Sequence, residues 1–268
     1  MYNLKFTVDK EKCIKCGLCQ KDCISKIIQT DTDGYPCVKD ETFCISCQHC
    51  LAVCPKGAIS VFGKNPDNSD EINNTISPEQ LENLIKARRS YRIFKQENID
   101  SETMNKLKNI LNWAPTGVNF RDLRFTIVEN KDTMVEIKET LYKKLKFLFK
   151  FIPLKKSLQP FKQAILDGND VIFRNAPHMI VVSTNKKAPC KEIDPIIALS
   201  YFELYAQSLG IGTLWCGFAY KTLPFSKEVM KKLEIPKTHK LSYVMLFGKP
   251  DIKYQRAIQP DNHKITVL

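Results

Sequence analysis

Four cysteines fall within eleven consecutive residues near the start of the chain, in the stretch CIKCGLCQKDC of residues 13–23. Cysteine thiolates ligate metals and iron–sulfur clusters, and in oxidising compartments cysteines form disulfides instead. Nine of the eleven cysteines precede residue 55, and the N-terminus shows no secretory signal, so we expect a cytoplasmic protein. This crowding favours metal ligation or redox chemistry.

The first sixty residues contain an internal repeat with an offset of 31 residues. Each half has the spacing C-x2-C-x2-C-x3-C, and the offset matches Cys13, Cys16, Cys19 and Cys23 with Cys44, Cys47, Cys50 and Cys54. Cys37 falls opposite Phe6, outside the pattern. We therefore expect Cys37 to be a small buried residue in the hairpin that connects the two halves.

This spacing resembles that of bacterial ferredoxins with two [4Fe–4S] clusters, in which the fourth cysteine of each run ligates the other cluster. Pro55 after the last cysteine fits the resemblance, whereas Ile24 stands where the family usually has a second proline. The resemblance implies a first ligand set of Cys13, Cys16, Cys19 and Cys54. It implies a second set of Cys44, Cys47, Cys50 and Cys23.

A pair of zinc sites is the alternative for so many cysteines. Zinc sites usually separate two C-x2-C hooks by about fifteen residues or more, whereas here the hooks overlap. His49 lies between two of the expected ligands, but each set of four thiolates is complete without it. We therefore expect clusters rather than zinc, with His49 an exposed polar residue.

The composition is that of a folded globular protein with a basic excess. Of 268 residues, 43% are apolar and 26% charged, and the formal net charge is +12. Residues 1–63 hold eight lysines against seven acidic residues, so nearly all of the excess lies in the remainder. The sequence shows no motif for binding nucleic acid and no apolar run of about eighteen residues that would span a membrane. The charge instead favours an anionic cofactor, an acidic substrate or an acidic partner protein.

A polar stretch without apolar periodicity, residues 64–77, predicts a linker between two domains, residues 1–63 and 78–268. The second domain begins with a predicted helix, for which Ser77 and Gln80 form a capping box around Pro78. Further predicted elements are a helix capped by Ser101, helices over 131–150, 192–209 and 224–234, and strands over 123–130, 178–184, 212–218 and 241–248. This mixture indicates an α+β fold around one central sheet.

The stretch of residues 141–161 interleaves lysines with bulky apolar residues, which also occurs in helices that lie on membranes. We favour a half-buried helix followed by a proline-broken lid over a pocket, with residues 140–175 forming the lid region.

Four stretches of the second domain suit a flat, phosphorylated ligand. Residues 88–94, RRSYRIF, offer three guanidinium groups and a hydroxyl to a phosphate monoester. Residues 114–120, APTGVNF, present an asparagine that can donate to and accept from a heterocycle edge. Residues 208–218 contain glycines where a backbone can approach a flat ligand, and residues 247–256 add positive charge.

In order and spacing these stretches resemble the nitroreductase family of flavin enzymes, so the whole chain resembles a ferredoxin–nitroreductase fusion of the kind found in anaerobes. The resemblance implies a nitroreductase-like mixed sheet flanked by helices, and a homodimer with FMN at each subunit interface. The residues it implies for FMN are Arg88, Arg89, Ser90, Arg92, Pro115, Thr116, Asn119, Cys216, Gly217, Lys253 and Arg256. Among these, the arginines, Lys253 and Ser90 would serve the phosphate and ring edge, and Cys216 with Gly217 would lie near the reactive nitrogen. Phe120, Arg121 and Asp122 stand where many relatives have a Gln-Pro pair.

The expected function is electron conversion, because clusters move single electrons and FMN can deliver a hydride. We expect an external ferredoxin or another low-potential donor, and as acceptor a nitroaromatic, a quinone or an activated alkene. No catalytic acid or base is predicted, and no histidine lies near Cys216 to make it a nucleophile; we expect His178, His239 and His263 to be structural or exposed. The alternatives are an electron-transfer protein that serves another protein, an NAD(P)H-dependent flavin enzyme without a dinucleotide-binding domain, and an enzyme that remodels its flavin.

Overall fold

The computed structural model describes residues 3–72, 75–151, 153, 155–261 and 263–268. The chain divides into two compact units, the first of Met1–Thr75 with Val118–Phe120 and the second of Ile76–Gly117 with Arg121–Leu268. Asn73 and Asn74 of the predicted linker, and Ile152 and Leu154 of the predicted lid region, lie outside the described residues.

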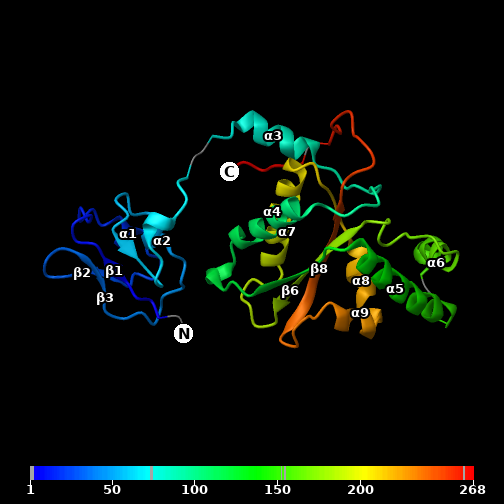
Figure 1. The fold of residues 1–268 in the computed structure, drawn as a ribbon, viewed down its shortest axis with the longest axis horizontal. Helices are drawn as coiled ribbons and strands as arrows, with labels where there is room; N and C mark the ends of the chain where they lie inside the picture. Colours follow the sequence, from blue (N-terminus) through cyan, green and yellow to red (C-terminus); the bar gives the residue numbers. More distant parts are fainter. Residues whose placement is uncertain (1–2, 73–74, 152, 154, 262) are drawn as a thin grey trace. The chain divides into compact units, whose positions relative to one another are not determined.

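The first unit shows the sequence repeat in its backbone (Figure 1). Its two short helices, α1 (Leu18–Asp22) and α2 (His49–Ala52), begin 31 residues apart, as do the strands β2 (Ile28–Thr30) and β4 (Ile59–Ser60). Strand β2 pairs with β3 (Pro36–Val38), and β4 pairs with β1 (Thr7–Val8), both antiparallel. The repeat predicted from the sequence is therefore also a structural repeat.

The core of the first unit is small and takes side chains from both halves of the repeat. Ile28 and its counterpart Ile59 are both buried, together with Leu4, Cys19, Leu51 and Val61. Cys37 lies in β3 and is only half-buried, so the expectation of a buried residue there was wrong. The reason is that this hairpin is too short to be covered on both faces.

The second unit is built around one four-stranded sheet with the order β5-β6-β8-β7. Its strands are β5 (Leu123–Val128), β6 (His178–Asn185), β7 (Gly212–Trp215) and β8 (His239–Gly248). All three pairings are antiparallel, and an isolated parallel bridge joins Ser90 to Thr213 at the β7 edge. Each predicted strand is present, and the bridge gives the sheet its mixed character.

Helices cover both faces of this sheet (Figure 1). Because side chains alternate along a strand, Met179 and Val181 of β6 join one core cluster, whereas Ile180 and Val182 join the other. The first face is covered by α5 (Lys131–Phe151), α6 (Gln159–Leu166), α8 (Gly217–Thr222) and α9 (Lys227–Lys232). The second face is covered by α4 (Ser101–Ile110) and α7 (Asp194–Ser208). The unit therefore has three layers.

The helix termini largely follow the sequence signals. Helix α3 (Pro78–Ala87) begins with the predicted capping box, in which Ser77 Oγ accepts from Gln80 N at 3.2 Å. The cap of α4 was predicted wrongly, because Asp100 rather than Ser101 accepts from the backbone, at Thr103 N. The Asp100 carboxylate, one residue before Ser101, reaches the backbone N–H of Thr103, the third residue of the helix. Ser101 therefore lies inside the first turn of α4.

Short 3-10 turns complete the fold: Pro66–Asn68, Leu111–Trp113, Gly117–Asn119, Lys156–Leu158 and Leu223–Phe225. The last of these turns precedes α9, so the helix predicted over 224–234 is divided into two shorter pieces.

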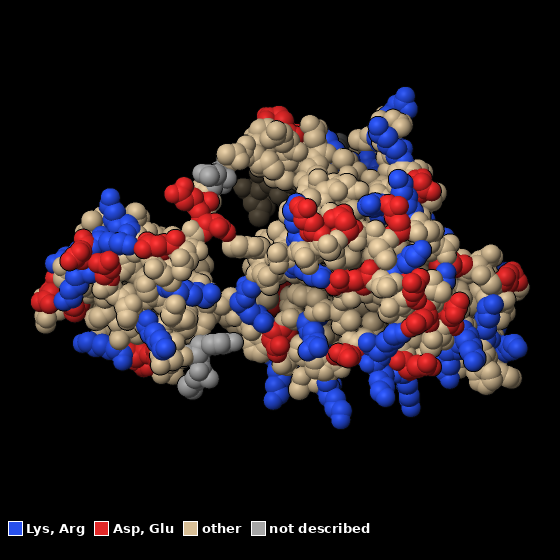
Figure 2. Space-filling model, viewed as in Figure 1, with Lys and Arg blue, Asp and Glu red and all other residues tan. Residues whose placement is uncertain are grey.

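Within the described ranges, no helix combines the length and apolar character that crossing a membrane requires. On the visible face of the second unit, Lys and Arg side chains are interspersed with Asp and Glu (Figure 2). The basic excess is thus spread over this face instead of forming one patch.

Candidate functional site

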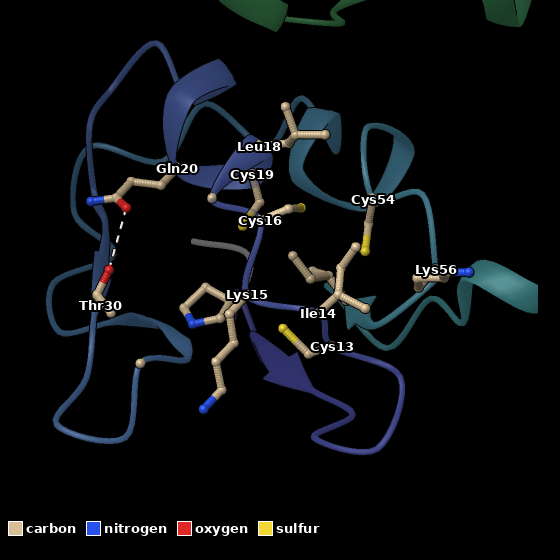
Figure 3. Close-up of a pocket in the computed structure, with 14 residues that line it drawn as sticks. Cys13, Ile14, Lys15, Cys16, Leu18, Cys19, Gln20, Thr30, Cys54 and Lys56 are labelled. Atoms are coloured by element: carbon tan, nitrogen blue, oxygen red, sulfur yellow. Dashed lines mark hydrogen bonds between the residues drawn. The ribbon is translucent and has the colours of Figure 1, made fainter.

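Four thiols of the first unit line one cavity of about 220 Å³ (Figure 3). Cys13, Cys16 and Cys19 reach it from the loop before α1 and from α1 itself, and Cys54 reaches it from the far end of the other repeat. These are the four cysteines that the sequence assigns to one cluster. Lys15, Gly34 and Pro36 complete part of the wall.

The other four thiols line a second, smaller cavity of about 30 Å³. Cys44, Cys47 and Cys50 belong to the second repeat, whereas Cys23 comes from the end of the first. Its remaining walls are mainly apolar, with Leu4, Phe6, Ile28, Val38 and Phe62 among them. Each cavity therefore receives three cysteines from one repeat and one from the other.

Left-handed backbone explains how closely spaced cysteines face one hollow. Lys15 and Gly17 have φ values of 56° and 71°, and their counterparts Ser46 and Gln48 have 57° and 63°. Such residues reverse the local direction of the chain, which turns the thiols on either side of them inward. The same bend recurs in both repeats because the spacing of the cysteines requires it.

The donor chemistry of these cavities fits iron–sulfur clusters. Burial raises the pKa of Cys19 and Cys44, and it raises the pKa of Cys50 to about 11, so cluster binding would release protons from these thiols. Throughout the described ranges, no three His, Cys, Asp or Glu side chains are close enough to hold one metal ion. Cys37 is among the wall residues of neither cavity, and His49 is exposed, with Nδ1 3.1 Å from Asp22 Oδ2.

In the second unit, the arginine-rich segment of residues 88–94 runs beside β7. Tyr91 N donates to Thr213 O at 2.9 Å, and Ser90 bridges the same residue. Arg88 Nη1 lies 3.4 Å from Oε1 of Glu203, a buried carboxylate on α7. The side chain of Arg89 donates to the Arg88 carbonyl oxygen. Strand β7 and helix α7 thus fix the segment from two sides.

Gly210 and Gly212 have roles in the fold of the second unit itself. Gly210 has a φ of 73° and forms the turn after α7, a conformation that favours glycine. A Cβ atom on Gly212 would lie 2.6 Å from Cγ of Tyr91. Gly212 is therefore needed so that the Tyr91 ring can pack against the strand, and the expectation that a ligand approaches the backbone at Gly212 was wrong.

Five of the eleven FMN residues predicted from the sequence line two cavities of the second unit, and Arg88, Arg89 and Ser90 line neither. Arg92, Cys216 and Gly217 line a cavity of about 390 Å³, whose other walls include Ile172, Leu214, Trp215 and Phe218. Lys253 and Arg256 line a cavity of about 530 Å³ together with Lys86 and Tyr91. The first combines an apolar wall with cations, and the second gathers three cations. Together they fit a flat aromatic ring and a phosphate.

The predicted residues of the APTGVNF stretch lie outside both cavities. Pro115 is exposed, and Thr116 Oγ1 accepts from Arg121 N at 2.9 Å. Gly117 N donates to the buried Asp194 carboxylate at 3.0 Å, which ties the loop to α7. Asn119 belongs to the first unit, where its Nδ2 donates to Ile45 O at 2.9 Å. The flavin contacts of Pro115, Thr116 and Asn119 stay predictions.

Cys216 is a buried thiol, which agrees with the prediction that it is not a nucleophile. Its Sγ donates to Ile172 O at 3.2 Å and accepts from Ala219 N at 3.3 Å. Burial raises the pKa of Cys216 to about 11, which keeps it protonated at neutral pH. His178 and His239 are buried, and His263 is exposed.

Comparison with known proteins identifies the second unit. The model of the nitroreductase family matches residues 85–249, more than half of the chain. The chain belongs to the nitroreductase family. This nitroreductase-family protein is 26% identical to an iodotyrosine deiodinase of Thermotoga neapolitana, over 65% of its own length and 90% of the relative's. Its fold is that of a nitroreductase with bound FMN from Desulfitobacterium hafniense, with a TM-score of 0.59 and 24% identity over 72% of this chain and 100% of the other.

The first unit of the nitroreductase-family protein matches the model of a 4Fe–4S dicluster domain over residues 12–59. It is also 36% identical to an uncharacterized ferredoxin of Methanocaldococcus jannaschii, over 26% of this chain and 95% of the ferredoxin. These memberships confirm the predicted fold, the predicted cofactor types of FMN and two [4Fe–4S] clusters, and the predicted class of oxidoreductase.

Two cations of the Cys216 cavity were missed by the sequence interpretation. Arg174 and Lys221 line it beside Arg92, although they lie in different parts of the chain. Arg174 precedes β6 and Lys221 lies on α8, and neither belongs to a recognisable motif. The only sequence signal was the basic excess of this domain, which does not point to particular residues.

Proposed function

We propose that this protein takes electrons from a low-potential donor, such as an external ferredoxin, and passes them to a small organic acceptor. The observation that carries the proposal is that one chain joins a dicluster iron–sulfur domain to a nitroreductase-family domain. When bound, the clusters supply one-electron transfer and FMN supplies two-electron reduction, so the chain would convert between the two. We also propose that residues 64–77 link domains of residues 1–63 and 78–268.

The cluster ligands in this proposal are the two crossed sets of cysteines. Cys13, Cys16, Cys19 and Cys54 would hold one cluster, and Cys44, Cys47, Cys50 and Cys23 the other. The support is that each set of four thiols lines a single cavity. Replacing Cys23 or Cys54 would therefore affect the cluster that the opposite repeat mainly holds.

For FMN, Arg92, Cys216 and Gly217 would lie at the ring, and Lys253 and Arg256 at the phosphate. The support is the apolar and cationic lining of the two cavities. Tyr91 and Arg92 are consecutive residues, yet each lines a different one of these cavities. A ligand that reaches from one cavity to the other would thus follow the segment that Arg88, Arg89 and Ser90 begin.

The proposed assembly is a homodimer. Helix α3 exposes Leu81 and Ile85, which are 42% and 51% exposed, and the turn after α4 exposes Trp113 at 68%. Exposed large apolar side chains such as these are available for association with another protein. A second copy of the chain is the partner that the family resemblance implies.

The acceptor in this proposal is a nitroaromatic, a quinone or an activated alkene. The 26% identity to an iodotyrosine deiodinase favours adding halogenated phenols to the set of compounds tested. Reductive removal of a halide from such a compound consumes two electrons and one proton and releases the halide ion. The reducing equivalents would come from the same low-potential donor.

The proposed path is tested under anaerobic conditions with the intact protein and a matched pair of variants. Cys16→Ala should lower iron content and slow flavin reduction by reduced ferredoxin, whereas Cys37→Ala should keep about eight irons per chain. The measurements are iron and sulfide analysis and stopped-flow absorbance of the flavin. Unchanged flavin reduction in Cys16→Ala protein that has lost a cluster would contradict the path. Reduction by NADPH but not by ferredoxin would make the nicotinamide the donor.

A further inference from the structure

The Cys216 cavity carries more positive charge than one flavin-ring contact requires. Arg92, Arg174 and Lys221 all line it, and none of its described lining residues is acidic. We propose that Arg174 and Lys221 bind the carboxylate of an aromatic acceptor in this cavity. The inference rests on the proposed function, because the acceptor would meet the flavin at Cys216 and Gly217.

These cations are available for a ligand. Arg92 Nη1 donates to Ser90 O at 3.2 Å, and the proposed function already places Arg92 at the flavin. Within the ranges that the structure describes, no carboxylate forms an ion pair with Arg92, Arg174 or Lys221. An arginine and a lysine on one cavity offer planar paired donors and a mobile ammonium, which together suit a carboxylate.

The walls of the cavity indicate that the anion is aromatic. Ile172, Leu214, Trp215 and Phe218 supply apolar surface, and Phe218 stacks on Phe161 of α6 with ring centroids 4.5 Å apart. Beside the flavin ring, a small inorganic anion would leave the remaining apolar surface in contact with water, whereas a benzoate-like compound would cover it. The combination of cations with a flat apolar wall therefore favours an aromatic carboxylate.

The backbone at Arg174 is held in an unusual conformation. Arg174 and Asn175 have φ values of 53° and 51°, and two consecutive non-glycine residues in the left-handed region cost conformational free energy. Asp170 stabilises this bend, because its carboxylate accepts from Phe173 N at 2.8 Å and from Asn175 N at 2.9 Å. Tyr142 Oη donates to the same carboxylate at 2.8 Å.

This network joins helix α5 to the segment of residues 170–175. Lys138 Nζ lies 3.9 Å from Asp170 Oδ2, and Tyr142 Oη also accepts from Ile172 N at 3.0 Å. Asp170 is thus engaged on both oxygens, and it is not among the residues that line the cavity. The contacts fix the strained backbone from which the Arg174 side chain extends, and strained backbone of this kind often occurs at ligand-binding sites.

Arg174 is also close enough to act on the thiol at the centre of the cavity. Burial has the largest effect on the pKa of Cys216 and raises it, the negative charge of Asp170 raises it further, and the positive charge of Arg174 has a smaller, lowering effect. The guanidinium therefore lies within electrostatic range of the residues expected at the flavin.

Benzoate is the probe, because it carries the anion but accepts no electrons. We expect it to perturb the flavin absorbance of the wild-type holoenzyme on titration. Arg174→Gln should weaken benzoate binding by roughly tenfold or more, as the loss of a charge-assisted hydrogen bond does, and Arg174→Lys should recover part of the affinity. Arg124→Gln, an exposed arginine on β5, is the matched control and should bind as the wild type does.

The second arm compares 4-nitrobenzoate with its neutral methyl ester as acceptors. Wild-type protein should prefer the carboxylate, Arg174→Gln should lose the preference through a higher KM for 4-nitrobenzoate, and Arg124→Gln should keep the wild-type preference. Equal benzoate affinity in the wild type and Arg174→Gln overturns the proposal, as does loss of FMN from Arg174→Gln, because Arg174 would then hold the cofactor. If the wild type reduces neither compound, the proposed function fails, and the benzoate titration still decides the anion site.

Discussion

Replacing Tyr142 by phenylalanine removes a buried hydroxyl that has two partners in the network beneath Arg174. The hydroxyl donates to Asp170 Oδ1 at 2.8 Å and accepts from Ile172 N at 3.0 Å. Burial raises the pKa of Tyr142, so the group remains a protonated donor at all ordinary pH values. A hydrogen bond to a carboxylate contributes about 1.5–3 kcal/mol, and a buried amide left without a partner costs about 1–3 kcal/mol.

Because one hydroxyl makes both contacts, the two effects overlap, and we expect Tyr142→Phe to lower the free energy of unfolding by about 2–4 kcal/mol. The assay is equilibrium urea unfolding followed by tryptophan fluorescence. Both tryptophans, Trp113 and Trp215, lie in the second unit, so the signal reports the unit that contains Tyr142. Benzoate affinity should fall in the same variant, because the bend at Arg174 loses part of its support.

The control is Tyr201→Phe, in which the side chain changes in the same way at a position 42% exposed to water. This substitution should change the free energy of unfolding by no more than about 0.5 kcal/mol. If Tyr142→Phe loses no more than the control does, the hydroxyl does not support the network, and the reasoning about Arg174 loses its structural basis.

Three further predictions concern stability and reactivity. Ser77→Ala should destabilise α3 by about 1 kcal/mol in urea unfolding, whereas Ser101→Ala, where Asp100 is the cap, should change little; equal losses would contradict the capping assignment. Burial lowers the pKa of His178, so the unfolded chain binds the proton at a higher pH than the folded protein does. The free energy of unfolding should therefore fall as the pH drops below about 6.5, the usual pKa of histidine. Urea midpoints measured from pH 7 to 5 would show this fall, and His178→Gln should reduce the pH dependence. Burial raises the pKa of Cys216 to about 11, so at pH 8 iodoacetamide should alkylate Cys216 more slowly than the half-buried Cys190. Peptide mass spectrometry measures the two rates, and equal rates would refute this prediction.

The sequence predicts those features whose physical cause is local. The C-x2-C-x2-C spacing is local and predicts that three thiols of each repeat face one hollow, whereas the fourth, Cys54 or Cys23, was assigned through the ferredoxin resemblance. The capping box at Ser77 is likewise local, since it depends on residues three positions apart. Where two capping residues stand side by side, as Asp100 and Ser101 do, the pattern alone did not select the correct one.

Features that depend on tertiary contacts were not predictable in the same way. Arg92, Arg174 and Lys221 meet because the strand order β6-β8-β7 brings their elements together, and no spacing in the sequence encodes that order. Gly212 was misinterpreted for the same reason, since its partner Tyr91 lies more than a hundred residues away. Such a contact gives a glycine a packing role that its neighbours in sequence do not reveal.

The mixed lining of the two cysteine cavities has a consequence for biosynthesis. Neither cavity has its four thiols until the chain has been made through the second repeat, because Cys54 completes the first cavity and Cys44, Cys47 and Cys50 supply most of the second. The ribosome therefore delivers the first repeat one thiol short of a full set. The proposed second ligand set is complete once residue 50 has emerged and the first once residue 54 has, so insertion of either cluster into a nascent chain would wait for the second repeat.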